Sequence, residues 1–303
     1  MNAFLLLRNI TVENANAIAG QTWGFPAITH FLGFGHALQR KLAEQGQEEF
    51  KLQFSGCAVI CHQLDVQSQQ ANAYSEHVFS LTRNPLTKEE KSPSFVEEGR
   101  ARMKVSVLLT IEKLDIYEDD MERLEALILN LAQTQRLAGG LITHIQKARV
   151  VELNDGTNDQ QEQVNFWMRT LLPGYLLVAR PQLLREQSEH FDGQANPVFS
   201  AWLDNSTLQR NADKTIQAKN YPGWVRPIVT GYRAISPLYD PGEVAKSRDA
   251  ETPVRFVEYA YTLGEWLSPH RINRLEQVLW HYDHEPGSDW YVCKNHYEQF
   301  LTE

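Results

Sequence analysis

The chain has 303 residues, 42% hydrophobic and 22% charged, a composition typical of one large globular domain or two small ones. We find neither an apolar run near the ~20 residues of a membrane span nor a leader peptide, and therefore expect a cytoplasmic protein without membrane contact. The net charge of −9 argues against nucleic-acid binding by the surface as a whole, although binding depends on local charge. Three cysteines fit a reducing compartment.

The first half of the chain predicts the order strand, helix, strand, strand, helix, strand. The strands are expected at residues 4–12, 51–66, 101–111 and 141–153, and the helices at 29–45 and 119–136. Apolar residues recur at helical spacing in the first helix, as at Phe31, Phe34 and Leu38, and alternate in the third strand. We expect Thr29 to cap the first helix and Gly139-Gly140 to end the second. This order is the ferredoxin-like arrangement and predicts an α+β fold.

The remaining segments predict an insertion and a less regular second half. Residues 67–100 form a long connection that we interpret as a protruding hairpin. Further along we expect a helix at 160–172, a strand at 175–179, helical structure at 181–208, strands at 224–235, 255–262 and 290–293, and a helix at 269–281. The chain then divides into residues 1–153 with the insertion, a variable helical region at 154–223, and a β-rich segment at 224–303 that packs on the first part.

A polar loop at residues 14–25 separates the first strand from the first helix. Its candidate nucleic-acid ligands are the amides of Asn14 and Asn16, which can read base edges, and the rings of Trp23 and Phe25, which can stack on bases. The alternative is a structural loop, in which the asparagines cap turns and Trp23 packs in the core. The residues alone leave both open.

A glycine pair follows an arginine after the second predicted helix. Gly139 and Gly140 would let the backbone approach a phosphate closely, with Arg136 pairing to it. An ordinary helix end, with glycine in the left-handed conformation, explains the same residues.

Further cations lie in the insertion and in the second half. Arg83, Asn84 and Arg100 flank or belong to the hairpin, where arginine can clamp phosphate, although a solvated charged loop is the alternative. A basic stretch interleaved with aromatic residues suits a groove that follows a nucleic-acid backbone: Arg226, Arg233, Lys246, Arg248, Arg255 and Arg271. Acidic residues share that stretch, so surface salt bridges explain it equally well.

Metal and catalytic patterns are weak. Cys57 and Cys61 would lie ~13 Å apart on an ideal strand, too far to share one ion, and His62 would point to the opposite side. The pair His281 and His284 does not match a zinc motif. The general acid–base candidates are His30 and His36, which helical spacing places on different faces. We therefore expect no metal, no cofactor and no enzymatic activity.

Ordered sequence blocks along nearly the whole chain resemble one protein family. They include Asn-Ala-Asn-Ala-Ile at 14–18, Thr-Trp-Gly-Phe-Pro at 22–26, residues 36–40, 81–86, 96–100, 136–140, 171–174, 236–239, 241–244, 251–253 and 255–258, and Gly-Glu-Trp-Leu-Ser-Pro-His-Arg at 264–271. The chain is similar to the second Csy subunit of the type I-F CRISPR surveillance complex, a Cas-five-type member of the RAMP (repeat-associated mysterious protein) superfamily. The region at residues 154–223 looks shorter than the corresponding region of the family and divergent from it in sequence.

The resemblance implies an RNA-recognition-like palm with an inserted thumb and a non-catalytic role in antiviral defence. The subunit would hold the 5′ handle of the CRISPR RNA, pair with the large Csy subunit and meet the repeated backbone Csy subunits. The assembled complex would recognise double-stranded DNA, and the resemblance leaves open whether this subunit contacts that DNA. Arg40, in the block at 36–40, joins the candidate RNA ligands on this ground. The competing class is a RAMP endoribonuclease that processes repeat RNA.

Overall fold

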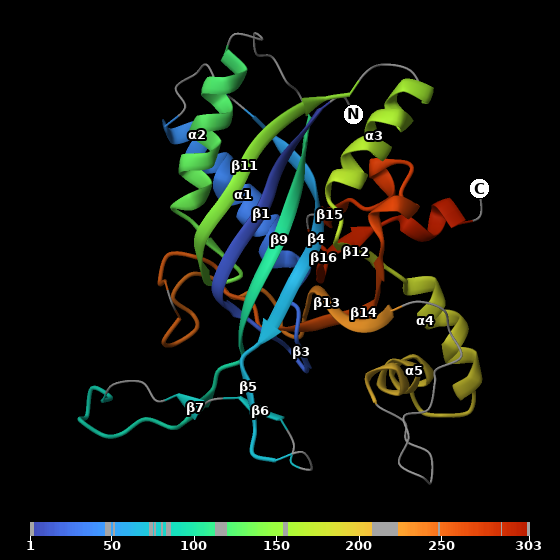
Figure 1. Cartoon of the computed structure of the whole chain (residues 1–303). Coiled ribbons are helices and arrows are strands. Elements are labelled where there is room, and N and C mark those ends of the chain that lie inside the picture. Colours follow the sequence, from blue (N-terminus) through green and yellow to red (C-terminus); the bar gives the residue numbers. More distant parts are fainter. Residues whose placement is uncertain are drawn as a thin grey trace.

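A large antiparallel sheet dominates the computed structural model shown in Figure 1. The structure describes residues 3–45, 50, 52–72, 75, 77–79, 81–82, 86–112, 120–153, 157–207, 224–247, 249–285 and 287–301. The α-helices within these ranges are α1 (Ile28–Gln45), α2 (Met121–Gln133), α3 (Thr157–Thr170), α4 (Pro181–Ser188) and α5 (Pro197–Ser206). The mixed helix and strand content expected from the sequence is confirmed.

The large sheet has ten strands in the order β10-β11-β1-β9-β4-β12-β14-β13-β16-β15. Their bounds are β1 (Ala3–Asn16), β4 (Phe54–Val66), β9 (Arg100–Ile111), β10 (Arg136–Leu137), β11 (Gly140–Glu152), β12 (Tyr175–Ala179), β13 (Trp224–Ala234), β14 (Val257–Leu267), β15 (Trp280–Asp283) and β16 (Trp290–Asn295). Each pairing between neighbours is antiparallel.

Four strands and two helices from the first half form the centre of the molecule. The strands lie in the order β11-β1-β9-β4, with α1 following β1 and α2 following β9. Alternation along β1 buries Leu5 and Leu7 against these helices, beside Phe31 and Leu38 of α1. Figure 1 shows α1 and α2 on one side of the sheet and α3 on the other.

The opposite face of the same strands carries a second core. Phe4 and Leu6 point away from α1 and pack in a cluster with Val164 and Met168 of α3. The ring of Phe4 meets that of Trp167 edge-on, with centroids 6.1 Å apart. Successive side chains of β1 point to opposite faces. Because both faces are covered here, β1 begins with apolar residues at every position instead of apolar residues alternating with polar ones.

Strands of the second half continue the sheet and return to β4. Strand β12 pairs with β4 at Leu176 and Ile60, and β15 pairs with β4 at Trp280 and Cys57. The strands β12, β14, β13, β16 and β15 thus form a closed ring with the edge of β4. Strand β12 belongs to the predicted region 154–223. Because it pairs with β4 on one side and with β14 on the other, the sheet joins this region to the parts before and after it in the chain.

The structure corrects three predictions: the cap of the first helix, the end of the second helix and the helix at 269–281. Helix α1 begins at Ile28, so Thr29 lies inside its first turn. Helix α2 ends at Gln133, and the glycines after it form the turn between β10 and β11. The expected helix at 269–281 is replaced by two short 3₁₀ turns, Pro269–Arg271 and Leu275–Gln277, followed by β15. Two other 3₁₀ turns span Glu189–Phe191 and Tyr297–Leu301.

The segment between β4 and β9 projects from the main body, as expected, at the bottom of Figure 1. It contains two small antiparallel ribbons, β5 (Ser68–Gln70) with β6 (His77–Phe79), and β7 (Leu81–Thr82) with β8 (Val96–Glu97). A third ribbon, β2 (Ile18–Ala19) with β3 (Thr22–Trp23), follows β1. Within the described residues, no helix is long and apolar enough to cross a membrane.

Candidate nucleic-acid interface

The end of β1 meets the beginning of β9 and the β10–β11 turn at one corner of the sheet. The register between β1 and β9 shifts between Val12 and Ala15, and Asn14 adopts a positive φ of 56°. Beyond this bulge, the backbone N–H of Asn16 donates to the carbonyl of Ala138 at 2.8 Å. The amide of the next residue, Ala17, donates to Gly99 at 2.9 Å. Segments distant in sequence are thus fixed together. We call this region, residues 13–17, 99–100 and 136–140, the corner.

The glycines of the β10–β11 turn are required by its geometry. Gly139 has a φ of +74°, which an L-residue adopts only with strain. A Cβ on Gly140 would lie 2.6 Å from the carbonyl oxygen of Glu13 and 2.8 Å from the amide nitrogen of Ala15. The turn therefore packs directly on the β1 bulge, and glycine is needed for this close approach.

The two asparagines of the corner differ in their environment. The Asn16 side chain donates to the carbonyl of Ile18 at 2.8 Å and accepts from its amide at 3.1 Å, so it holds the start of the β2–β3 ribbon. The Asn14 side chain is exposed, and its Oδ1 accepts from Gln67 at 3.4 Å. Asn14 is the asparagine whose amide faces solvent.

The two aromatic rings of the loop also differ. Phe25 stacks on Phe31 of α1 with centroids 5.4 Å apart and meets Trp266 edge-on at 4.9 Å, so it anchors the loop to the core. Trp23 is 62% exposed and contacts Phe79 of the insertion edge-on at 5.6 Å. A pocket of about 280 Å³ lies between the β2–β3 ribbon and the β5–β6 ribbon, with Trp23 and Phe79 in its wall.

The arginines near the corner are not equivalent. Arg100 binds the carboxylate of Glu98 through two nitrogens at 2.7 and 3.2 Å, and Arg102 pairs with Glu13 at 2.7 Å. Arg136 is exposed and donates to the carbonyl of Gly139 at 3.1 Å, and it forms no ion pair with a described residue. It is the best-placed cation for a phosphate at this corner.

Other candidate ligands lie elsewhere. Arg40 is exposed on α1 and makes none of the contacts that hold the corner together. The guanidinium of Arg255 is engaged by Asp289 at 2.6 Å and by the carbonyls of Ser236 and Ser288, and thus joins two loops of the second half. Arg83, Asn84 and Arg248 lie outside the described residues.

The described residues contain no group of three or more His, Cys, Asp or Glu side chains that could hold a metal ion. Burial raises the pKa of the Cys61 thiol to about 12, so it stays protonated. The ring of His30 contacts the carbonyl of Ala27 at 3.2 Å, and burial lowers the pKa of this histidine. His36 is exposed on the same helix.

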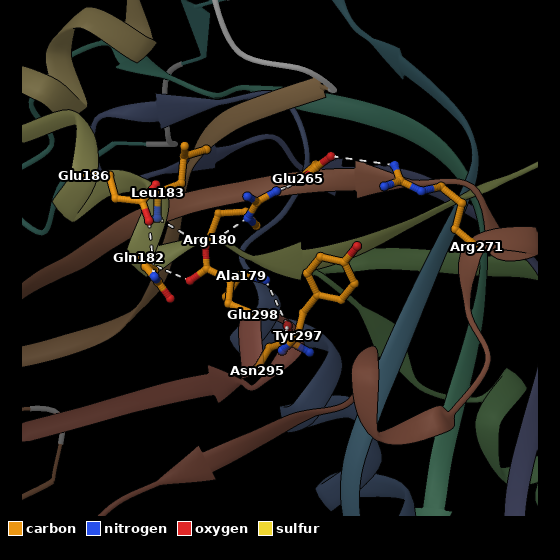
Figure 2. Close-up of polar contacts among 10 residues, drawn as sticks. All are labelled: Ala179, Arg180, Gln182, Leu183, Glu186, Glu265, Arg271, Asn295, Tyr297 and Glu298. Carbon is orange, nitrogen blue, oxygen red and sulfur yellow. Dashed lines mark hydrogen bonds and ion pairs between the residues drawn. The ribbon is translucent and has the colours of Figure 1, made fainter. Parts of the chain in front are cut away.

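A partly buried ion network in the second half serves a structural purpose (Figure 2). Arg180 pairs with Glu265 of β14 and with Glu298 at 2.9 Å. The carboxylate of Glu298 also accepts hydrogen bonds from the backbone N–H groups of Gln182 at 2.6 Å and Leu183 at 3.2 Å. These groups lie in the first turn of α4 and have no acceptor within the helix. The network fixes α4 to β14 and to the C-terminal 3₁₀ turn.

Sequence reasoning did not find a pocket of about 560 Å³ beside the loop. The described residues in its wall come from β2–β3 and the loop that follows, α1, β4, β12, α5, β13 and β14, and include Trp23, Trp202, Asn205, Trp224 and Arg226. No local motif marks it, because its parts lie far apart in the sequence. The sequence pointed to two of its walls separately, through the rings of Trp23 and Phe25 and through the basic and aromatic interleaving near residue 226.

The fold and the corner define an α+β protein with one long antiparallel sheet and an exposed polar corner. The profile of the CRISPR-associated protein family Cas_Csy2 matches residues 5–293. The CRISPR-associated protein Csy2 of Pseudomonas aeruginosa (strain UCBPP-PA14) is 37% identical over 311 positions, which cover 95% of this chain and 94% of the relative. The chain therefore belongs to the Csy2 family of CRISPR-associated proteins, and the expected family is confirmed.

Proposed function

We propose that this protein is a non-catalytic RNA-binding subunit of the type I-F CRISPR surveillance complex and acts in the cytoplasm. It holds the 5′ handle of the CRISPR RNA, pairs with the large Csy subunit and meets the repeated backbone Csy subunits. Family membership over nearly the whole chain supports this role. An acidic chain is compatible with it, because only a patch of handle size must be basic.

The topology supports the finer assignment to a ferredoxin-like palm with an inserted thumb, of the Cas-five-type RAMP class. The elements β1, α1, β4, β9, α2 and β11 follow one another with strand order β11-β1-β9-β4, all antiparallel. The insertion between β4 and β9 would be the thumb, and Phe79 of its β5–β6 ribbon contacts Trp23 of the first loop.

The observation that carries the proposal is the convergence of three separate segments at the corner. The β1 bulge with Asn14, the glycine turn with Arg136 and the start of β9 are joined by the backbone bonds of Asn16 and Ala17. Backbone turns rich in glycine, with one arginine that forms no ion pair with a described residue and an exposed side-chain amide, suit a phosphate and an adjacent base edge. The handle would lie between this corner and the insertion.

RNA binding by the complex reconstituted with the large Csy subunit tests the site. Arg136→Ala should weaken binding by about 1.5–3 kcal/mol and lower the salt slope by about one ion, since one charged phosphate contact is lost. Asn14→Ala should reduce the preference for the correct handle over a scrambled one. Asn16→Ala should weaken the binding of the correct and the scrambled handle alike, because the Asn16 side chain holds the loop instead of facing solvent.

The matched control is Arg185→Ala, an exposed arginine on α4 outside the corner. It should bind both handles as the parent does. If Arg136→Ala and Asn14→Ala also bind both handles like the parent across a salt series, the corner is not the handle site.

The competing function, cleavage of repeat RNA, needs a general base beside a 2′-hydroxyl. The described histidines of α1 do not form a pair with each other, since His30 is engaged with Ala27 and His36 is exposed. We therefore propose that purified protein leaves repeat RNA intact. Site-specific cleavage that disappears in His30→Ala or His36→Ala would establish the endoribonuclease instead.

A further inference from the structure

Two arginines at the start of β9 lie next to the end of β1, and a carboxylate binds each of them. Arg100 and Arg102 occupy alternate positions of the strand, so their side chains lie on the same face of the sheet. Glu98 binds Arg100 through two guanidinium nitrogens, and Glu13 binds Arg102 at 2.7 Å. Unlike Arg136, these two cations are therefore occupied by acidic side chains of the same chain.

The backbone around the pair of Glu98 and Arg100 is fixed at the corner. Arg100 pairs with the end of β1, and its carbonyl accepts the N–H of Gln67 at 2.8 Å. Between the two charged residues, a Cβ on Gly99 would lie 2.5 Å from the side chain of Ile18, so the segment packs tightly on the first loop. The backbone of the arginine is thus held in place, whereas its guanidinium can change partner.

Both ion pairs are accessible to solvent. The side chains of Arg100 and Glu98 are 38% and 35% exposed, and those of Arg102 and Glu13 are 60% and 28% exposed. Ion pairs at such exposure contribute little to stability, because water screens them and two long side chains must be ordered. A phosphate accepts the planar fork of an arginine in the same bidentate geometry as a carboxylate. Replacing the carboxylate at Arg100 by a phosphate therefore costs little.

We propose that Glu98 restrains RNA binding at the corner by occupying Arg100, which exchanges this carboxylate for an RNA phosphate when the handle binds. The inference deepens the proposed function and rests on it for the identity of the anion. After the exchange, Glu98 remains beside the phosphate and repels it. An RNA that offers only its backbone charge is then held weakly, whereas one that also satisfies Asn14 is retained. The acidic side chain thus suppresses non-specific binding.

Glu13 has the same arrangement with a smaller expected effect. The hydrogen bond and charge of Glu13 raise the pKa of Arg102, and the charge of Asp65 contributes in the same direction. Asp65 is also the partner of Arg102 in the register of β4 and β9. Removing the charge of Glu13 therefore leaves Arg102 beside a second carboxylate, and Glu98→Gln should release a cation more completely than Glu13→Gln.

RNA titrations of the heterodimer with the large Csy subunit test the restraint through the sign of one effect. Glu98→Gln should strengthen the binding of both the correct and the scrambled handle about three- to tenfold, since a like charge close to the phosphate is removed. Glu13→Gln should give a smaller gain. Arg100→Ala should weaken the binding of both RNAs, and the gain from Glu98→Gln should be smaller in the Arg100→Ala background, because no arginine is then released.

The matched control is Glu186→Gln, which makes the same change in net charge at an exposed position on α4. It should bind both RNAs like the parent. Thermal melting verifies that each variant heterodimer folds. If Glu98 instead orients Arg100 for the RNA or serves only the fold, Glu98→Gln weakens binding or leaves it unchanged.

Two further variants separate the restraint from the proposed site. A loss or no change in Glu98→Gln, where Arg136→Ala still weakens binding, overturns the restraint and leaves the corner as the handle site. If Arg136→Ala, Asn14→Ala and Glu98→Gln all bind both RNAs like the parent, the restraint and the proposed site are both wrong.

Discussion

His62 joins three segments through a chain of hydrogen bonds that a neutral ring can satisfy. Its Nδ1 lies 2.7 Å from the carbonyl of Pro173 and its Nε2 lies 2.7 Å from the hydroxyl of Ser106, which accepts the amide of Asn9 at 3.0 Å. A neutral imidazole that donates to the carbonyl and accepts from the hydroxyl satisfies every atom. Burial lowers the pKa of His62, the bond to Pro173 opposes this, and the nearby positive charges of Lys104 and Arg8 lower it further.

This histidine should make stability depend on pH. Its folded pKa lies below the unfolded value near 6.5, so the unfolded chain binds more protons between the two values. The stabilisation is complete above pH ~6.5 and is lost as the pH falls toward the folded pKa. His30 is partly buried, and because burial lowers its pKa as well, it adds a loss of stability in the same direction. His62→Gln should therefore lose less unfolding free energy than the parent between pH 7 and 5, measured by urea denaturation.

The control for this prediction is His36→Gln, at an exposed position on α1. It should keep the parental dependence on pH. Equal slopes for the parent and His62→Gln would mean that the ring does not titrate in this window.

At the scale of elements, the β10–β11 turn separates two costs of replacing glycine. Gly140→Ala places a Cβ 2.6 Å from the Glu13 carbonyl, so the turn must move away from the bulge, at about 1–3 kcal/mol. Gly139→Ala meets no atom within 4 Å and suffers only its positive φ, at about 1–2 kcal/mol. Gly140→Ala should also weaken handle binding, whereas Gly139→Asn, which tolerates this φ, should retain both properties. Denaturation and RNA titration of the three variants decide this.

The ion network of Figure 2 should control the stability of α4. Glu298→Gln removes a carboxylate that binds Arg180 and the first turn of the helix, which should cost about 1–3 kcal/mol. Glu186→Gln, an exposed position on the same helix, should cost less than about 0.5 kcal/mol. Limited proteolysis near α4, compared between the two variants, checks whether the loss is local. Equal resistance and equal stability would contradict this role.

The sequence predicted elements best where the signal was local. Strand β12 was predicted with its observed bounds, because a short apolar run lies between Pro-Gly and Arg-Pro. The helix predicted at 269–281 is absent, although Ile272, Leu275 and Val278 recur at a spacing compatible with a helix and all three are buried. Asn295 from β16 instead binds the carbonyls of Gln277 and Leu279, a long-range contact that periodicity does not reveal.

The candidate site was predictable in part. The sequence indicated the loop with Asn14 and Trp23 and the glycine turn with Arg136. It gave no reason to expect their contact, which depends on the bulge in β1. Trp202 and Asn205 of the pocket carry no local signal, since the pocket they line is formed with segments as distant in the chain as Trp23.

At the scale of the whole molecule, the second half exposes a notable apolar surface. Large side chains that are 40–64% exposed include Trp224, Ile235, Leu238, Phe256, Val257, Tyr259, Trp290 and Tyr291. Exposed apolar residues in such number favour a covering partner. We predict that the chain is poorly stable alone and forms a heterodimer with the large Csy subunit. A well-folded monomer that does not bind this subunit in size-exclusion chromatography would contradict the prediction.

The most direct measurement of the central claim is crosslinking within the assembled complex. Guide RNA with 4-thiouridine at successive handle positions is irradiated, and the crosslinked peptides of this subunit are identified by mass spectrometry. The account predicts crosslinks to the loop at 14–25 and to the turn at 136–140, reduced in Arg136→Ala and unchanged in Arg185→Ala. Handle crosslinks confined to other segments of this subunit, or to other subunits, would contradict it.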